Sequence, residues 1–465
     1  MNKQAEEKAG PAMAGLVFFQ NSYGKHSETR LACIYRKNRK AIKGGASMKV
    51  RMRRLWLLVS ACLLLFTAAC SQAPAPVEQS KKVEAYTRPA VVRVVAYNTA
   101  SFVIAGELAQ YIGVSRLTEY DGGTGSGAVL SPNGYIVTNA HVVEAIHQEE
   151  AQAHEAMYNI LLADLYDRFK QISPATADAD IQHVQSYFDQ YIKLEAFERV
   201  STVILPGGEE LAFDIKSYGK PIGEGKDVAI LKVNARDLPI VFVDETDGDG
   251  SAASSSIQFA GYPGKADLGG FLDEKSQREA TYSSGTVSVS QKTMKNGAPV
   301  IQLNADLNPG NSGGPVLSEE GKMIGIATAT SHEGIGWVIP SSTVMEFVRQ
   351  AGAEVNKPAM TTMLWQEGLG YYWSGYYSKA IPKFEEVRRL YDKHYSVATY
   401  LAKSQKAISE GNDRIDWREY NLYFAIGGAA ILVLVIGLII WARRQKSRRQ
   451  QTENEKKEAE KSMKE

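Results

Sequence analysis

The stretch Asn308-Pro309-Gly310-Asn311-Ser312-Gly313-Gly314-Pro315 decides how this 465-residue chain is interpreted. It places Ser312 between glycines, shortly after the apolar run Ile301–Leu303, which predicts a strand. Glycine lets the backbone turn sharply and leaves amide N–H groups free to face a ligand. A serine nucleophile needs such a setting, because its hydroxyl must be accessible and the oxyanion formed on attack needs N–H donors. Alone, the turn fits an ordinary glycine-rich loop equally well.

A base and an acid lie upstream in contexts that suit a catalytic triad. His141 follows the apolar run Ile136–Val137, and Asp227 stands directly before the strand-like run Val228–Val233. The order along the chain is therefore His, Asp, Ser, which is one of the known orders of a Ser-His-Asp triad. Each of these residues alone could be structural, but the three placements together favour a triad.

Five motifs in register resemble those of the HtrA/Deg group of trypsin-like serine proteases. Three carry the triad residues: TNAHVV at 138–143, DVAILKV at 227–233 and NPGNSGGPV at 308–316. Two more resemble the strand before the histidine motif and the last barrel strand: GTGSGAVL at 123–130 and GIGWVIPS at 334–341.

The resemblance implies a mostly β fold, a chymotrypsin-like double six-stranded β-barrel over residues 86–355. It also implies the roles of the site residues. Ser312 attacks the scissile carbonyl, His141 takes and returns the proton, and Asp227 orients the imidazole. The backbone N–H groups of Gly310 and Ser312 form the oxyanion hole. Such chemistry calls for protein or peptide substrates and for no metal or cofactor.

Composition narrows the remaining function classes. The chain has 53 Lys+Arg and 52 Asp+Glu residues, and no basic stripe interleaved with aromatics predicts nucleic-acid binding. Its three cysteines and seven scattered histidines show no zinc-ligand spacing. All three cysteines precede the expected protease domain, so we expect packing, rather than disulfides, to stabilise it.

The N-terminal region contains a secretory signal that starts late. Residues 48–70 show basic residues, an apolar run and small residues before Cys70. We therefore expect residues 1–47 to be an extension upstream of the true start; a genuine cytoplasmic leader is the alternative. Cys70 is a candidate for lipidation, although Thr67 departs from the usual pattern, and nearby cleavage or an uncleaved anchor are the rivals. Residues 71–85 then form a tether.

Two departures from the compact members of the family flank the catalytic motifs. Apolar residues at helical spacing predict a helical hairpin inserted at 144–197, which acts as a lid, a docking surface or an oligomer contact, or only packs on the barrel. After the barrels, where most such proteases carry a PDZ domain, residues 359–410 show the spacing of a tetratricopeptide-like helix pair, including Gly368, Ala380 and Phe384.

A second apolar run predicts a transmembrane helix over residues 422–441. The basic tail at 442–465 begins directly after it, which by the positive-inside rule places the tail in the cytoplasm and the protease domain outside it. Because the tail is charged and has few apolar residues, we expect it to be disordered.

The sequence therefore predicts a single-pass, membrane-anchored extracytoplasmic serine endopeptidase that cleaves envelope or secreted proteins, unfolded or damaged ones in particular. The alternative is a non-catalytic or site-specific signalling or scaffold protein. Trimers are common in the family, but no residue here indicates one. Asp306 lies six residues before Ser312, at the spacing of a carboxylate that selects a basic P1 side chain, which leaves Lys/Arg preference open against a small apolar pocket.

Overall fold

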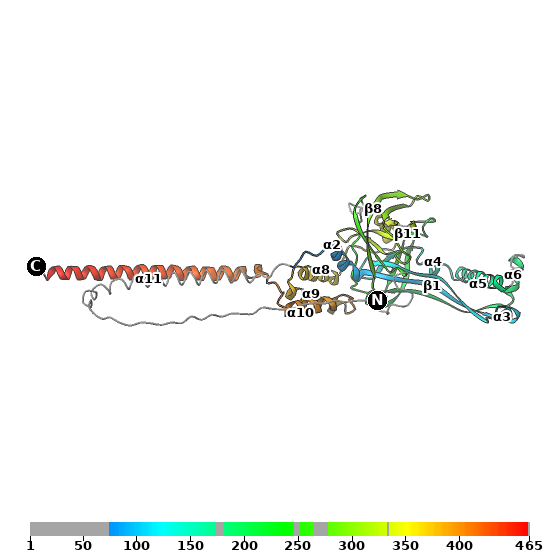
Figure 1. The fold of residues 1–465 in the computed structure, drawn as a ribbon, viewed down its shortest axis with the longest axis horizontal. Coiled ribbons are helices and arrows are strands. Elements are labelled where there is room, and N and C mark those ends of the chain that lie inside the picture. Colours follow the sequence, from blue (N-terminus) through cyan, green and yellow to red (C-terminus); the bar gives the residue numbers. More distant parts are fainter. Residues whose placement is uncertain (1–73, 173–180, 246–251, 265–277, 333, 464–465) are drawn as a thin grey trace, which may run out of the picture. The chain divides into compact units, whose positions relative to one another are not determined.

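The computed structural model describes residues 74–172, 181–245, 252–264, 278–332 and 334–463. The expected extension and the signal segment lie outside the described residues. What is described consists of two β-barrels, a helical insertion, three C-terminal helices and one long helix (Figure 1).

The first barrel is closed and contains six strands in the order β1-β2-β3-β6-β5-β4. Inward-facing small and β-branched side chains alternate with outward ones along β1, so that Val92, Val94 and Ala96 are fully buried. The strands are β1 (Val91–Ile104), β2 (Arg116–Val129), β3 (Tyr135–Thr138), β4 (Ile192–Ile204), β5 (Glu210–Tyr218) and β6 (Ala229–Val233).

The second barrel is also closed and six-stranded, in the order β10-β11-β12-β9-β8-β7. Its interior is apolar, with Ile257, Leu303 and Val316 in one cluster. The strands are β7 (Ser256–Gly261), β8 (Thr281–Thr293), β9 (Pro299–Asn304), β10 (Pro315–Leu317), β11 (Met323–His332) and β12 (Ile335–Pro340). The double six-stranded barrel predicted from the motifs is confirmed.

The insertion after the histidine motif has its own core. Strands β1, β2 and β4 continue beyond the first barrel, with Ile104 paired to Ile192, and α5 packs on β1 and β2 (Figure 1). Met157, Leu161 and Leu165 of α5 bury themselves against Phe102 of β1. The helices of this arm are α3 (Gly106–Ile112), α4 (Glu144–His147), α5 (Glu150–Ile172) and α6 (Ile181–Asp189).

Residues 192–197, expected inside the helical insertion, instead begin strand β4, which starts at Ile192. The reason is the pairing with β1, which continues as far as Ile104. Helical spacing of apolar residues does not reveal such a strand, because residues 193–196 of β4 are exposed and show little apolar alternation.

Three helices follow the barrels after α7 (Ser341–Gln350): α8 (Met360–Trp373), α9 (Tyr377–Leu390) and α10 (Val397–Ser409). Helices α8 and α9 pack as a pair, and a Cβ atom on Gly368 would lie 2.6 Å from the Phe384 ring, so glycine allows the close approach. We call α8–α10 the helical segment. Its assignment to the tetratricopeptide type stays a prediction.

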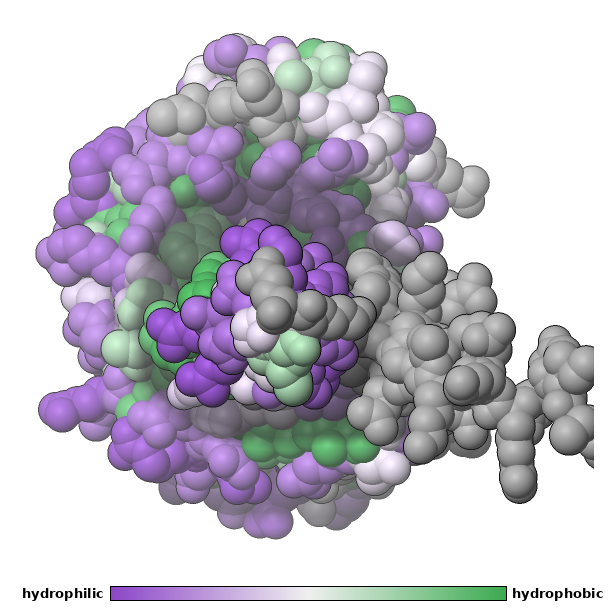
Figure 2. All heavy atoms as spheres, turned by 90° about the vertical axis from the view of Figure 1, so that its left-hand side faces the viewer, coloured by the Kyte–Doolittle hydropathy of each residue, from purple (hydrophilic) through white to green (hydrophobic). Residues whose placement is uncertain are grey.

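The helical segment contacts the N-terminal helix α2 (Gln79–Thr87), which is followed by the short η1 (Arg88–Ala90). The indole N–H of Trp365 donates to the Ala85 carbonyl at 2.9 Å. Lys393 pairs with Glu209 in the loop between β4 and β5 at 2.6 Å. On the face shown in Figure 2, hydrophilic residues dominate and hydrophobic ones gather in small groups.

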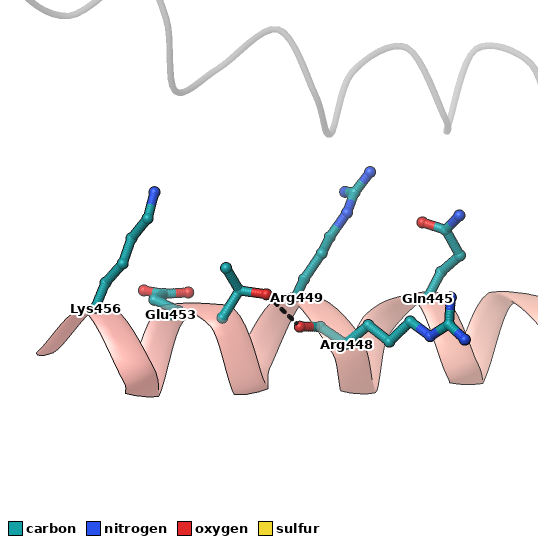
Figure 3. Close-up of a pocket in the computed structure, with 6 residues that line it drawn as sticks. Gln445, Arg448, Arg449, Glu453 and Lys456 are labelled. Carbon is teal, nitrogen blue, oxygen red and sulfur yellow. Dashed lines mark hydrogen bonds between the residues drawn. The ribbon is translucent and has the colours of Figure 1, made fainter. Parts of the chain in front are cut away.

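The last helix, α11 (Asn421–Ser462), follows η5 (Trp417–Tyr420) and is 42 residues long. Among the described residues it is the one helix long and apolar enough to cross a membrane, judged by length and composition. The expectation of a disordered tail is wrong, since the helix continues to Ser462. Figure 3 shows Arg448, Arg449, Glu453 and Lys456 along its polar part. Strong helix formers there extend a helix that is already nucleated.

Candidate active site

The Ser312 segment consists of two successive β-turns that share Asn311. Asn311 N–H donates to the Asn308 carbonyl at 2.9 Å, and Gly314 N–H donates to the Asn311 carbonyl at 2.9 Å. The third residue of each turn is a glycine with positive φ, 98° at Gly310 and 83° at Gly313. This is the type II pattern, in which that position favours glycine. The sequence therefore folds locally as the glycine spacing predicts.

Within the described part of the chain, the N–H groups of Gly310 and Ser312 have no hydrogen-bond partner, because a β-turn bonds only its first and last residues. Close packing around the glycines accompanies this shape. A Cβ atom on Gly310 would lie 2.3 Å from the Tyr262 carbonyl oxygen, and one on Gly313 would lie 2.2 Å from that of Ser126. The predicted oxyanion donors are therefore free, on a backbone that no larger residue could follow.

His141 and Asp227 are brought together, as the sequence predicts. The Nδ1 atom of His141 lies 3.0 and 3.1 Å from the two carboxylate oxygens of Asp227, and the His141 backbone N–H donates to the same carboxylate at 3.0 Å. Asp227 is fully buried, whereas the His141 side chain is 32% exposed. A buried carboxylate thus holds the imidazole by Nδ1 and leaves Nε2 for other contacts.

Asp227 sits on a constrained backbone. Its φ of 47° lies in the left-handed region, which aspartate tolerates better than most residues. Its N–H donates to the Lys220 carbonyl at 2.8 Å, and its own carbonyl accepts from Asn139 Nδ2 at 2.9 Å. Asn139 belongs to the histidine motif, so the loop that carries the acid is fastened to the loop that carries the base.

Thr328 of β11 is a site residue that motif reading missed. Its hydroxyl donates to Asp227 Oδ2, and its carbonyl accepts from the Ser312 hydroxyl at 3.1 Å. In this state the Ser312 hydroxyl bonds to Thr328 rather than to His141. One buried threonine therefore contacts both the acid and the serine. A Thr within an apolar strand carries no local signal of this role.

The two barrels meet beside the serine. A Cβ atom on Gly125 of β2 would lie 2.7 Å from Val142, the neighbour of His141, and 3.1 Å from the Ser312 carbonyl oxygen. The Ser126 N–H donates to that same carbonyl at 2.8 Å. The histidine loop and the serine turn thus both lie against the same stretch of β2.

The charges near His141 are mostly acidic. Burial raises the pKa of the Glu144 carboxyl above its usual range, and the negative charge of Glu224 adds to the effect, while His141 opposes it. Asp306, considered above as a selector of basic side chains, instead accepts a hydrogen bond from the Gly334 N–H in the turn between β11 and β12. One of its carboxylate oxygens therefore helps to hold that turn.

Across the described ranges, no three His, Cys, Asp or Glu side chains are grouped so as to hold a metal ion.

Comparison with known proteins assigns the central region. The family model of the trypsin-like peptidase domain matches residues 125–326. The serine protease Do-like HtrA of Lactococcus lactis is 30% identical over 177 residues, covering 34% of this chain and 40% of that protein. A probable periplasmic serine endoprotease, DegP-like, of Brucella suis is 30% identical over 233 residues, covering 49% of this chain and 32% of that protein.

The crystal structure of a serine endoprotease from Yersinia pestis aligns with a TM-score of 0.34 and 20% identity, covering 60% of this chain and 68% of that one. The fold assignment rests on the two closed barrels and not on that superposition. The chain spans less than half the length of the two relatives named above. Residues 125–326 thus match a trypsin-like peptidase domain, and the chain is similar to HtrA-like serine proteases.

Proposed function

We propose that this protein is a serine endopeptidase that uses Ser312 as nucleophile, His141 as general base and acid, and Asp227 as the residue that orients the imidazole. The observation that carries the proposal is the buried Asp227 carboxylate on His141 Nδ1 at 3.0 Å, beside a turn with two unbonded N–H groups. A serine in such a turn is a nucleophile only if a base with a fixed tautomer lies within reach.

The proposed reaction begins with rotation of the Ser312 hydroxyl from the Thr328 carbonyl towards His141 Nε2. His141 takes the proton as Oγ attacks the peptide carbonyl, and the resulting oxyanion accepts hydrogen bonds from the Gly310 and Ser312 N–H groups. The protonated imidazole then gives its proton to the leaving amine. Water repeats the sequence on the acyl-enzyme and releases the second product.

We further propose that the protease domain is extracytoplasmic and anchored by α11. One relative is named a periplasmic endoprotease, and the apolar stretch 422–441 of α11 is about 30 Å long at 1.5 Å per residue, which matches a bilayer core. The basic residues from Arg443 to Arg449 follow it directly, which favours a cytoplasmic C-terminal tail.

The proposed substrates are envelope or secreted proteins, in particular unfolded or damaged ones, by analogy with the family. We further propose that the helical segment is of the tetratricopeptide type and stands where most relatives would carry a PDZ domain. A protease that works on unfolded chains needs an accessible site more than a narrow pocket, and the partly exposed His141 side chain suits this.

The test uses the full-length protein in detergent. Wild type is expected to react at Ser312 with a fluorophosphonate and to cleave unfolded casein, whereas Ser312→Ala does neither. Ser318→Ala is the matched control, because this buried serine lies in the same barrel and bonds within its own turn to Glu320 at 2.7 Å. If folded wild type neither reacts nor cleaves, the scaffold alternative replaces the enzyme.

A further inference from the structure

Ser126 of β2 is a fully buried polar residue at the contact between the two barrels. It is the middle residue of Gly125-Ser126-Gly127, and its two neighbours have no room for side chains. A Cβ atom on Gly127 would lie 2.8 Å from the Val137 carbonyl oxygen, and one on Gly125 would lie 2.7 Å from Val142. Strand β2 thus places one side-chain hydroxyl at a position that is enclosed by closely packed backbone.

Every polar group of Ser126 is hydrogen-bonded. Its hydroxyl donates to the Gly310 carbonyl at 2.6 Å and accepts from the Tyr262 N–H at 2.9 Å. Its N–H donates to the Ser312 carbonyl at 2.8 Å, and its own carbonyl accepts from the Thr138 hydroxyl at 2.7 Å. Two of these hydrogen bonds reach the serine turn, which belongs to the second barrel. Because Ser126 belongs to the first barrel, both bonds link the two barrels.

The bonds complete a set that fixes the whole turn. The five consecutive carbonyls of residues 308–312 each accept a hydrogen bond, from Asn311 N, Gly264 N, Ser126 Oγ, Gly314 N and Ser126 N in that order. Because a trans peptide holds its C=O and N–H antiparallel, fixing a carbonyl also fixes the N–H of the next residue. The Gly310 N–H is therefore fixed through the Pro309 carbonyl, and the Ser312 N–H through the Asn311 carbonyl, while Ser126 fixes the peptide unit after each donor residue. Ser126 alone supplies two of the five donors.

We propose that Ser126 is a positioning residue for the oxyanion hole. By binding the carbonyls of Gly310 and Ser312, it holds the peptide unit that follows each donor residue. It thereby restrains the backbone on the C-terminal side of both donor residues, so that their N–H groups face the reacting carbonyl before substrate arrives. It touches neither the substrate nor the reacting atoms. The inference rests on the proposed endopeptidase function.

A purely structural role predicts a different outcome. A serine that only joins two barrels would, when removed, lower stability and leave catalysis by the folded fraction unchanged. A positioning residue affects the transition state more than the ground state, so its loss lowers kcat with little change in KM. Misplacement of catalytic groups by about 1 Å costs on the order of 10²-fold.

The experiment measures Ser126→Ala in the full-length protein at a temperature where it is folded. This substitution removes the hydroxyl bonds to Gly310 and Tyr262 and keeps the backbone bond to Ser312. We expect kcat to fall about 10- to 100-fold with KM within about twofold of wild type. The affinity for a peptidyl aldehyde, whose tetrahedral adduct places an oxyanion in the hole, should fall by the same factor as kcat/KM. Unchanged kcat and aldehyde affinity in the folded variant would overturn the proposal.

Ser131→Ala is the matched control. Ser131 is 2% exposed in the same barrel, and its hydroxyl bonds Asn133 within a turn, so its loss should affect stability but not kcat. If Ser126→Ala does not fold, Ser126→Cys replaces it, because the thiol fills similar space but donates weakly, and the same kcat and aldehyde losses are expected in smaller size. If the wild-type protein is inactive, the proposed endopeptidase function is itself refuted. If the wild type is active and the Ser126 variant has the same kcat and aldehyde affinity, only this inference is refuted.

Discussion

The serine turn, residues 308–314, and the helical segment α8–α10 are held in place by different kinds of interaction. In the turn, every carbonyl from residue 308 to residue 312 accepts a hydrogen bond. In the helical segment, the hydroxyls of Thr361 and Thr362 and both ring nitrogens of His394 are buried without a hydrogen-bond partner. What holds the helices is aromatic packing around Trp365, whose ring centroid lies 4.4 Å from His394 and 5.2 Å from Tyr400.

The two kinds of interaction serve different purposes: one positions groups precisely, and the other holds helices together. Hydrogen bonds are directional, so the turn can hold N–H groups within tenths of an ångström. Apolar packing is roughly proportional to area and has little direction, so it can attach the helices without setting any group to that accuracy. Changes in the two regions should therefore have different readouts, catalysis for one and stability for the other.

The largest effect is expected from a substitution at the active site, where directional hydrogen bonds position the groups. Asp227→Asn should lower kcat about 10⁴-fold, because an amide can present its NH₂ group to His141 Nδ1 and so favour the wrong tautomer. The fold should survive, since the side chain keeps its shape. Steady-state kinetics on a peptide substrate measures the loss, with the exposed Asp214→Asn as control. A decrease in kcat of less than about tenfold would mean that Asp227 has no part in the chemistry.

A smaller effect is expected from a substitution in the helical segment, which apolar packing holds together. Trp365→Ala should destabilise the helical segment by about 3–5 kcal/mol through the cavity it leaves, while peptidase activity stays near that of wild type. Denaturant unfolding in a Ser312→Ala background avoids self-cleavage, and Trp365→Phe separates the ring from its bond to Ala85. Activity that falls in parallel with stability would show that the two regions act as one.

The smallest effect concerns His394. Burial lowers its pKa to about 3 from an ordinary 6.5, so between these pH values the unfolded chain binds a proton that the folded chain does not. Stability is therefore fully present above pH 6.5 and falls with acidification, by at most about 1.4 kcal/mol per pH unit.

His394→Phe should remove that part of the pH dependence and cost little at neutral pH, because it replaces an unpaired polar group by an apolar ring. Unfolding free energies of both proteins at pH 7 and pH 5 measure the difference. Equal pH dependence of the two proteins would contradict the assignment of the buried neutral histidine.

The site residues that lie in continuous sequence motifs could be predicted from the sequence. His141, Asp227, Gly310 and Ser312 each occur in a segment whose glycine and apolar spacing predicts its local geometry. Thr328 and Asp306 could not be assigned this way, because their partners, Asp227 and the Gly334 N–H, come near only once β11 and β12 are paired. A partner 101 residues away leaves no local pattern.

The fold shows the same limit. The order of the three motifs predicted both barrels, yet the extension of β1, β2 and β4 into the arm was missed, since it depends on pairing between distant strands. The tail of α11 was wrongly expected to be disordered, because low apolar content argues against a packed core but not against a helix that continues from an existing one.

Helix α2 has a consequence for the order of folding. Its partners come from far along the chain: the Ala85 carbonyl binds Trp365 across 280 residues, and the Thr87 hydroxyl pairs with that of Tyr282 across 195. Although α2 is synthesised before both barrels, it cannot dock until almost the whole of them and α8 exist. Contacts of such long sequence separation form late and slowly. Although α2 is the first of the described helices to be synthesised, it is therefore expected to be among the last to gain protection from hydrogen exchange.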